Sequence, residues 1–239
     1  NSGAEANEAA LKISRLTGRK KIVAFVNSFH GRTMGALSMT GQKSKREPFK
    51  PLISHISFLP YGDEKALKRG ISRRTAMVIV EPIQGEAGVY TPAADYLQLA
   101  KKACSKKNVL LIADEIQTGI ARTGSLLAVC GTCTCQGHCE KQATYIQPDI
   151  LILGKALSGG FYPVSAVLAN DSIMNVIKPG QHGSTFGGNP VAARVAITAL
   201  EVVRDEHLAQ NARYLGDLFR SRMQVLVNKY NVLSKVRGK

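Results

Sequence analysis

The sequence is poor in aromatic and in acidic residues. It has no tryptophan, aromatic residues make up only 6% of its 239 residues, and 17 acidic residues stand against 32 lysines and arginines. The formal charge of +15 would suit an anionic partner such as nucleic acid. However, the basic residues are scattered without interleaved aromatic side chains for base stacking, and those at 101–107 are predicted to be the solvated face of a helix. Nucleic-acid binding is therefore the less favoured interpretation.

Long apolar runs are also missing. No run approaches the length that crosses a bilayer, and nothing at the start resembles a signal peptide. Hydrophobic residues make up 44% of the chain, which is ordinary for a globular protein of a size that can bury a large core. The chain begins inside a motif and stops at Val236–Lys239 without tapering, so we expect an internal part of a longer protein.

Cysteines are few and unevenly placed, because four of the five fall within ten residues that have no apolar period. This composition predicts an inserted surface loop at residues 130–147. Four thiolates would suffice for a tetrahedral zinc site, although their spacing is not the usual pair of C-x2-C hooks. A reduced loop or an error in the gene model is the favoured alternative. The candidate zinc ligands are Cys130, Cys133, Cys135 and Cys139, with His138 as a spare.

Strand-like and helical segments alternate along the chain. This pattern predicts an α/β fold with a mostly parallel sheet and helices on both faces. The predicted strands are 21–26, 55–59, 76–80, 109–113, 149–153 and 164–169. The predicted helices are 4–16, 63–68, 96–106, 191–203 and 208–230.

Lys155 follows an apolar run, Ile150–Leu153, that carries no polar side chain. Such a run predicts a strand covered on both faces, so Lys155 is expected at the carboxyl edge of the sheet, where open α/β sheets bind ligands. A neutral amine in that position can attack a carbonyl carbon. A solvated lysine is the simpler interpretation of this residue taken alone.

Acidic residues follow two other predicted strands. Asp114 directly follows the strand 109–113, and Glu81 and Glu86 follow the strand 76–80. A buried carboxylate needs a cation or hydrogen-bond donors. A metal is one answer, a helix-capping role is another, and a protonated ring nitrogen, which makes a heterocycle an electron sink, is a third. Because the carboxyl ends of parallel strands share one edge, these polar groups are predicted to converge.

Two further segments could complete a ligand site. Ser2 and Glu5 form a capping-box pattern, which predicts a helix start whose first amides, at Gly3 and Ala4, are free to hold a phosphate.

The second segment follows the first predicted strand. Phe29 could stack on a ring, and Arg32 could clamp a carboxylate. His30, between them, is either a base or, more simply, a packed and hydrogen-bonded histidine.

Six segments, in family order and spread over nearly the whole chain, resemble the class III pyridoxal-phosphate aminotransferases. They are residues 1–7, 29–33, 81–86, 114–119, 154–160 and 182–190, whereas the cysteine-rich loop has no counterpart. The resemblance implies the large domain of the fold type I pyridoxal-phosphate transferases at residues 1–205, incomplete at its N-terminus. Residues 206–239 would be an exit helix toward a C-terminal small domain that lies outside this chain.

The same resemblance implies roles for the residues that bind pyridoxal 5'-phosphate. Lys155 would form a Schiff base with the cofactor, stay neutral through burial beside the ring, and shuttle the proton. Asp114 would pair with the ring nitrogen and Gln117 would lie near the ring hydroxyl. Phe29 would stack on the ring. The phosphate would bind to Gly3 and Ala4.

Other implied roles concern the substrate and a second subunit. Ser184 and Thr185 would reach the phosphate of the neighbouring subunit's cofactor, which predicts a homodimer with shared active sites. Arg32 would bind a substrate carboxylate. Glu86 would mask a second arginine, located in the C-terminal domain, so that a diamine can enter.

Residues 149–190 resemble the ornithine aminotransferases most, which implies transfer of the δ-amino group of ornithine to 2-oxoglutarate, giving glutamate semialdehyde and glutamate. The first third is equally similar to the acetylornithine aminotransferases, and 4-aminobutyrate is a further candidate donor. A catalytically silent fragment is the alternative of another class. The expected location is the mitochondrial matrix for a eukaryotic source and the cytoplasm for a bacterial one.

Overall fold

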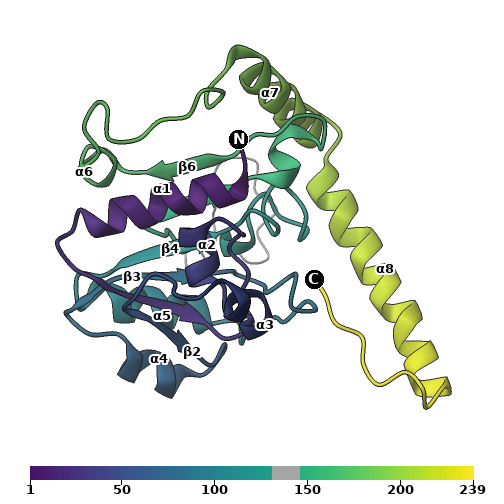
Figure 1. The fold of residues 1–239 in the computed structure, drawn as a ribbon. Helices are drawn as coiled ribbons and strands as arrows, with labels where there is room; N and C mark the ends of the chain where they lie inside the picture. The colour runs from purple at the N-terminus through teal and green to yellow at the C-terminus, as the bar shows by residue number, and fades with distance from the viewer. Residues whose placement is uncertain (131–145) are drawn as a thin grey trace.

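The computed structural model describes residues 1–130 and 146–239, and its centre is a six-stranded sheet with the order β2-β1-β3-β4-β5-β6 (Figure 1). The first five strands run parallel, and β6 is antiparallel to β5. This arrangement confirms the predicted α/β class. The strands are β1 (Lys21–Phe25), β2 (Ile56–Leu59), β3 (Thr75–Val80), β4 (Leu110–Asp114), β5 (Ile150–Leu153) and β6 (Ala166–Ala169).

The central strands are apolar along their length because both of their faces are covered. All six residues of β3 are buried. Val78 of β3 pairs with Val23 of β1 on one side and with Leu111 of β4 on the other. Continuous Val, Ile and Leu runs of this kind suit parallel strands that lie between two layers of helices.

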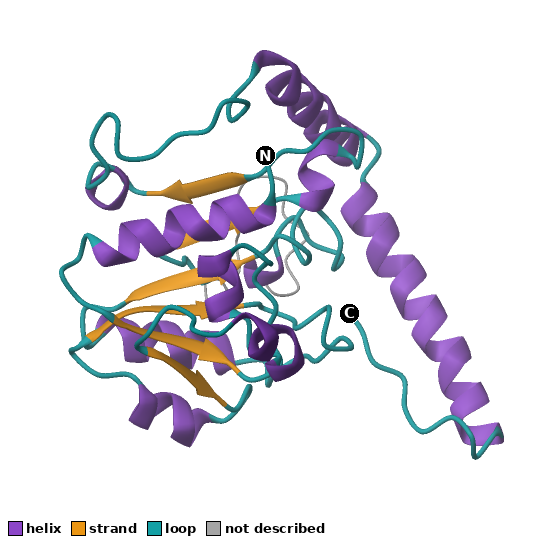
Figure 2. Cartoon of the chain, viewed as in Figure 1, coloured by secondary structure: helices purple, strands orange, loops and turns teal. Residues whose placement is uncertain are grey.

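Helices cover both faces of the sheet (Figure 2). One face packs against α1 (Gly3–Arg15), and the other packs against α4 (Glu64–Gly70) and α5 (Tyr96–Ser105). The first cluster includes Ala6, Ala10, Leu11 and Ile13 of α1 with Ile22, Ile79, Ile112 and Ile150 of the sheet. The second includes Leu67, Tyr96, Ala100 and Cys104 of the helices with Val23, Phe25, Val78 and Leu111.

Side-chain caps fix where several helices begin. Ser2 Oγ accepts a hydrogen bond from the Glu5 backbone N–H at 3.2 Å, and Glu5 Oε2 accepts one from the Ser2 N–H at 2.8 Å, which confirms the predicted capping box. Asp63 Oδ1 caps α4 by accepting a hydrogen bond from the Ala66 backbone N–H at 2.9 Å. Asn189 caps α7 (Pro190–Asp205), whose first residue is a proline.

Several short elements were not predicted from the sequence. They are α2 (Met34–Met39), α3 (Lys43–Arg46) and α6 (Asp171–Met174), and the 3₁₀ turns η1 (Glu47–Phe49), η2 (Ala128–Cys130) and η4 (Lys155–Ser158).

The basic residues at 101–107 are solvated in part, because Lys102 and Lys106 are exposed as predicted, whereas Lys101 and Lys107 contact neighbouring segments. Lys101 Nζ lies 2.7 Å from Asp149 Oδ1. Lys107 Nζ donates to the Ile71 carbonyl oxygen at 2.6 Å. Both lysines are half-buried, and each anchors α5 or the turn after it to a neighbouring segment.

The last helix, α8 (Leu208–Lys229), extends away from the sheet (Figure 1). None of its residues is buried. No helix within residues 1–130 and 146–239 is long and apolar enough to cross a membrane. Large apolar side chains are exposed on α7 and α8, namely Val191, Ile197, Leu200, Val202, Tyr214, Leu215, Phe219, Val225 and Leu226.

Candidate active site

A cavity of about 280 Å³ lies at the carboxyl ends of the parallel strands. Its walls come from the loops that follow β1, β3, β4 and β5 and from the first turn of α1. Parallel strands bring their carboxyl ends to one edge, so segments far apart in the sequence meet here. Nine of the predicted or discussed site residues line it together: Gly3, Ala4, Phe29, His30, Arg32, Glu81, Asp114, Gln117 and Lys155.

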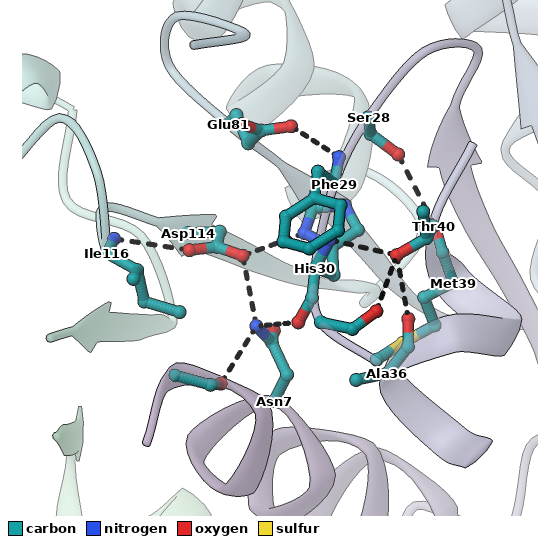
Figure 3. A network of polar contacts seen from close by, with 12 residues as sticks. Asn7, Ser28, Phe29, His30, Ala36, Met39, Thr40, Glu81, Asp114 and Ile116 are labelled. Atoms are coloured by element: carbon teal, nitrogen blue, oxygen red, sulfur yellow. Dashed lines mark hydrogen bonds and ion pairs between the residues drawn. The ribbon is translucent and has the colours of Figure 1, made fainter. Parts of the chain in front are cut away.

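Asp114 ends β4 with only 3% of its surface exposed, and its carboxylate is held by three donors (Figure 3). His30 Nδ1 lies 2.7 Å from Asp114 Oδ2, and Asn7 Nδ2 donates to the same oxygen at 3.0 Å. The backbone N–H of Ile116 donates to Asp114 Oδ1 at 3.2 Å. These bonds offset the cost of burying the carboxylate and fix its orientation.

Asn7 and His30 each keep one polar atom without a partner in the described residues. Asn7 Oδ1 and His30 Nε2 are both buried and unpaired. The remaining side-chain nitrogen of each residue is hydrogen-bonded. Asn7 Nδ2, for example, donates to the His30 carbonyl oxygen at 2.8 Å in addition to Asp114. The His30 backbone N–H donates to Thr40 Oγ1 at 3.0 Å. The simpler prediction for His30, a packed and hydrogen-bonded histidine, is therefore confirmed.

Glu81 is a site residue to which the sequence assigned no role. It follows β3, is 5% exposed, and accepts a hydrogen bond from the Phe29 backbone N–H at 2.8 Å. Burial raises the pKa of Glu81 to about 7, and the neighbouring Asp114 adds to the rise while His30 opposes it. Its position directly after a buried strand was the signal that pointed to it.

Lys155 lies in the same cavity and is exposed in this chain, and its burial beside a bound ring stays a prediction. The strand ends at Leu153, and Lys155 begins the turn η4 with a φ of 43°, in the left-handed region. This conformation is unusual for a residue with a side chain and is typical of functional sites. A second cavity of about 480 Å³ also reaches Lys155, which explains its exposure.

The first turn of α1 and Gln117 also line the cavity. The N–H groups of Gly3 and Ala4 have no partner within the helix, because a helix leaves its first amides free. A Cβ atom at Gly3 would lie 2.6 Å from Ile116 Cδ1, so glycine lets α1 approach the β4 loop closely. Similarly, a Cβ at Gly85 would lie 2.5 Å from Gln117 Oε1.

Phe29 is flanked by two cations at the rim of the cavity. Arg32 Cζ lies 5.6 Å and Lys45 Nζ 4.6 Å from the centre of its ring. Lys45 and Gln42 also donate hydrogen bonds to the Glu86 carboxylate. Partial burial raises the pKa of Glu86, but these hydrogen bonds outweigh it and the pKa is lowered.

Ser184 and Thr185 do not join the other predicted residues. They are exposed on the loop between α6 and α7 and do not line the cavity. Ser184 Oγ instead accepts hydrogen bonds from Asn1 Nδ2 at 2.8 Å and from the Gly187 N–H at 3.3 Å. Their predicted role in a neighbouring subunit stays a prediction.

The cysteine-rich segment carries most of the predicted zinc ligands. Cys133, Cys135, His138 and Cys139 lie outside the described residues. Cys130 ends η2 and is half-buried. Within the described part of the chain, no group of three or more His, Cys, Asp or Glu side chains could hold a metal ion.

Comparisons with known proteins agree with this geometry. A family model described as aminotransferase class-III matches residues 1–239. The mitochondrial ornithine aminotransferase of Drosophila melanogaster is 47% identical over 249 residues, covering 100% of this chain and 54% of the relative. The chain therefore spans little more than half the length of the curated relatives it matches.

Two solved structures are similar over the whole chain. The ornithine aminotransferase of Toxoplasma gondii has a TM-score of 0.91 at 42% identity, with 100% of this chain and 56% of that chain covered. The acetylornithine aminotransferase of Elizabethkingia anophelis has a TM-score of 0.81 at 48% identity, with 100% and 58% covered.

Proposed function

The chain belongs to the class III aminotransferase family, and from that premise we propose that the full-length protein transfers the δ-amino group of ornithine to 2-oxoglutarate with pyridoxal 5'-phosphate as cofactor. The products are glutamate semialdehyde and glutamate. The observation that carries this proposal is that Lys155, Asp114 and the first amides of α1 line one cavity. The ornithine aminotransferase names of the relatives support the choice of donor.

The residues of the cavity fit each polar group of the cofactor. The N–H groups of Gly3 and Ala4 at the positive end of α1 suit a phosphate. A carboxylate oxygen accepts two hydrogen bonds, and Asp114 Oδ1 has only one described donor, so it can accept another from a ring N–H. The Lys155 amine suits an aldehyde, and Phe29 offers a ring face.

When bound, pyridoxal phosphate supplies an electron sink that stabilises negative charge on the substrate carbon. The chain's own residues orient the reactants and move the proton. With the cofactor bound, Lys155 Nζ would take the proton from the carbon that bears the donor amine, hold it as an ammonium group, and return it to the carbon on the other side of the amine nitrogen. Asp114 would keep the ring nitrogen protonated, and His30 with Asn7 keeps the Asp114 carboxylate fixed.

Side chains at the rim of the active-site cavity bind the substrate in this proposal. Arg32 is exposed beside Phe29, and its guanidinium can bind a carboxylate through two parallel hydrogen bonds. Glu86 places a negative charge near Arg32, at the opening of the active-site cavity. This charge favours a donor with a second amine, because that amine is positively charged. Its contacts with Lys45 and Gln42 hold it in an ionised form.

The domain division and the dimer are part of the same proposal. Residues 1–205 form the cofactor-binding large domain with an insertion at 130–147, and residues 206–239 lead toward a small domain. The exposure of α8 and the apolar side chains on α7 and α8 support further protein packed against them. Phe161 and Phe186, 90% and 69% exposed, support an interface beside Ser184 and Thr185 with a second subunit.

Acetylornithine is the second candidate donor, supported by the acetylornithine aminotransferase that is 48% identical. A spectral titration of the full-length protein loaded with pyridoxal phosphate separates the candidates. Ornithine is expected to bleach the cofactor band at the lowest concentration, ahead of acetylornithine and 4-aminobutyrate. A lower half-saturating concentration for acetylornithine would overturn the choice of donor, and no bleaching by any amine would leave the catalytically silent alternative. The mitochondrial ornithine aminotransferases of two Drosophila species support a mitochondrial location for a eukaryotic source.

A further inference from the structure

A basic cleft lies at the edge of the sheet opposite to the candidate active site. Its volume is about 610 Å³, and the residues that form it either precede β1, β2 and β3 or begin β1 and β2. It is therefore built at the amino ends of these parallel strands, whereas the active-site cavity lies at their carboxyl ends. The titratable residues in its wall are Arg19, Lys20, Lys21, His55, Arg73 and Arg74.

The strand order brings these residues together from three separate segments. β1 lies between β2 and β3 in the sheet, with Ile22 paired to Ile56 and Lys21 paired to Thr75. The chain segments that enter the three strands must therefore be neighbours. The Ile22 N–H donates to the His55 carbonyl oxygen at 2.9 Å, which joins two of the segments directly.

Two of the cations, Arg19 and Lys21, form hydrogen bonds that join the segments of the cleft. Arg19 Nη1 donates to the Thr75 carbonyl oxygen at 3.2 Å and also to the carbonyl oxygen of Asn108. Lys21 Nζ donates to the Gly70 carbonyl oxygen at 2.7 Å. These bonds tie the loop after α1 to the start of β3, and the start of β1 to the end of α4.

The other three cations are free to bind a ligand. Lys20, Arg73 and Arg74 are exposed, and their side chains form no hydrogen bond or ion pair with a described residue. No aspartate or glutamate is among the residues that line the cleft. Five permanent positive charges thus surround one hollow without an anion, and each repels the others.

We propose that this cleft binds a compact polyphosphate, either inorganic or as the phosphate chain of a nucleotide. Arginine and lysine form strong charge-assisted hydrogen bonds with phosphate oxygens. A chain of phosphates matches free cations that come from two different segments, and the cleft has room for more than a single phosphate. Nucleic acid is the less suitable ligand because no Phe, Tyr or Trp lines the cleft for base stacking.

Isothermal titration of the full-length protein with inorganic tripolyphosphate, at constant ionic strength, tests the proposal. We expect one saturable site per chain. The double variant Arg73→Gln with Arg74→Gln is expected to weaken binding by about 10-fold or more, because two charge-assisted contacts are lost. The matched control, Arg194→Gln with Arg222→Gln, removes the same charge from α7 and α8, which contribute nothing to the cleft. It is expected to change the affinity by less than about twofold.

The single variant Lys20→Gln gives the same test if the double variant does not fold, because this side chain is exposed and unpaired among the described residues. Titration with ATP distinguishes the two sources of the ligand, since binding as tight as that of tripolyphosphate indicates a nucleotide and weaker binding indicates the inorganic form. Absence of a saturable site, or equal weakening by the two double variants, would overturn the proposal. Displacement of tripolyphosphate by a tighter-binding single-stranded RNA would also overturn it.

Discussion

His30 and Asp114 form a buried pair in which His30 Nδ1 lies 2.7 Å from Asp114 Oδ2. Asp114 ends β4, whereas His30 lies in the loop that follows β1. A carboxylate buried to this extent needs its donors, and the histidine needs the carboxylate to fix its ring orientation. The pair therefore links the stability of this edge of the sheet to the chemistry proposed for Asp114.

Replacing His30 by leucine is expected to lower the free energy of unfolding by about 1–3 kcal/mol, because Asp114 loses a donor while it stays buried. Urea unfolding of the full-length protein without cofactor measures this change. His182→Leu is the matched control. Its ring is exposed and lies 3.2 Å from Lys12 Nζ, so a change within about 0.5 kcal/mol is expected. Equal losses in the two variants would contradict the proposed importance of the pair.

Asp114→Asn keeps the shape of the side chain but removes its charge. Because the proposed role of Asp114 is to keep a ring nitrogen protonated, we expect kcat to fall by about 100-fold or more while the protein still folds. Steady-state assays with ornithine and 2-oxoglutarate measure the effect. Asp63→Asn is the control, since asparagine caps a helix as well as aspartate does. A kcat within a factor of about two of the wild-type value would remove the electron-sink role.

Lys155→Arg is expected to abolish turnover, because arginine keeps the positive charge but cannot act as a neutral amine. Borohydride reduction followed by mass spectrometry provides a readout that does not depend on activity. The wild-type protein is expected to retain the reduced cofactor covalently, and the variant is not. Lys102→Arg, on the exposed face of α5, should behave like the wild type. Covalent retention in the Lys155 variant would show that another lysine holds the cofactor.

Most of the fold could be predicted because its strands are continuous apolar runs. The predicted strand at 76–80 corresponds to β3 and the one at 149–153 to β5, each within one residue at either end. α2 escaped prediction for a physical reason. Five of its six residues are buried, so it has no polar face to give a helical period, and Thr33 provides no side-chain cap.

The candidate site was predicted less completely than the fold. Asp114 and Lys155 could be predicted because each comes at the end of an apolar run that is recognisable as a buried strand. Asn7 did not stand out, because an asparagine inside a helix has no signal that shows which face it lies on. Its contacts with His30 and Asp114 depend on how α1 packs on the sheet, and sequence patterns do not fix that packing.

Glu81 is expected to make the protein less stable as the pH rises. Its carboxyl has an ordinary pKa of 4.5 when the chain is unfolded and a pKa of about 7 in the folded state, where burial disfavours the charged form. Between these values the unfolded chain releases a proton that the folded chain keeps. The free energy of unfolding therefore falls across this range, by about 3 kcal/mol, and the contribution is constant at higher pH.

Glu81→Gln should remove this pH dependence without removing the hydrogen bond, because the amide oxygen can still accept from the Phe29 N–H. Urea unfolding at several pH values between 4.5 and 7 measures the slope. The stability of the variant relative to the wild type is expected to increase with pH and to level off above 7. Glu206→Gln, at an exposed position after α7, is the control and should keep the wild-type slope. If the Glu81 variant and the wild type showed the same slope, the folded carboxyl would not carry the proton, and Glu81 would be an ionised neighbour of Asp114.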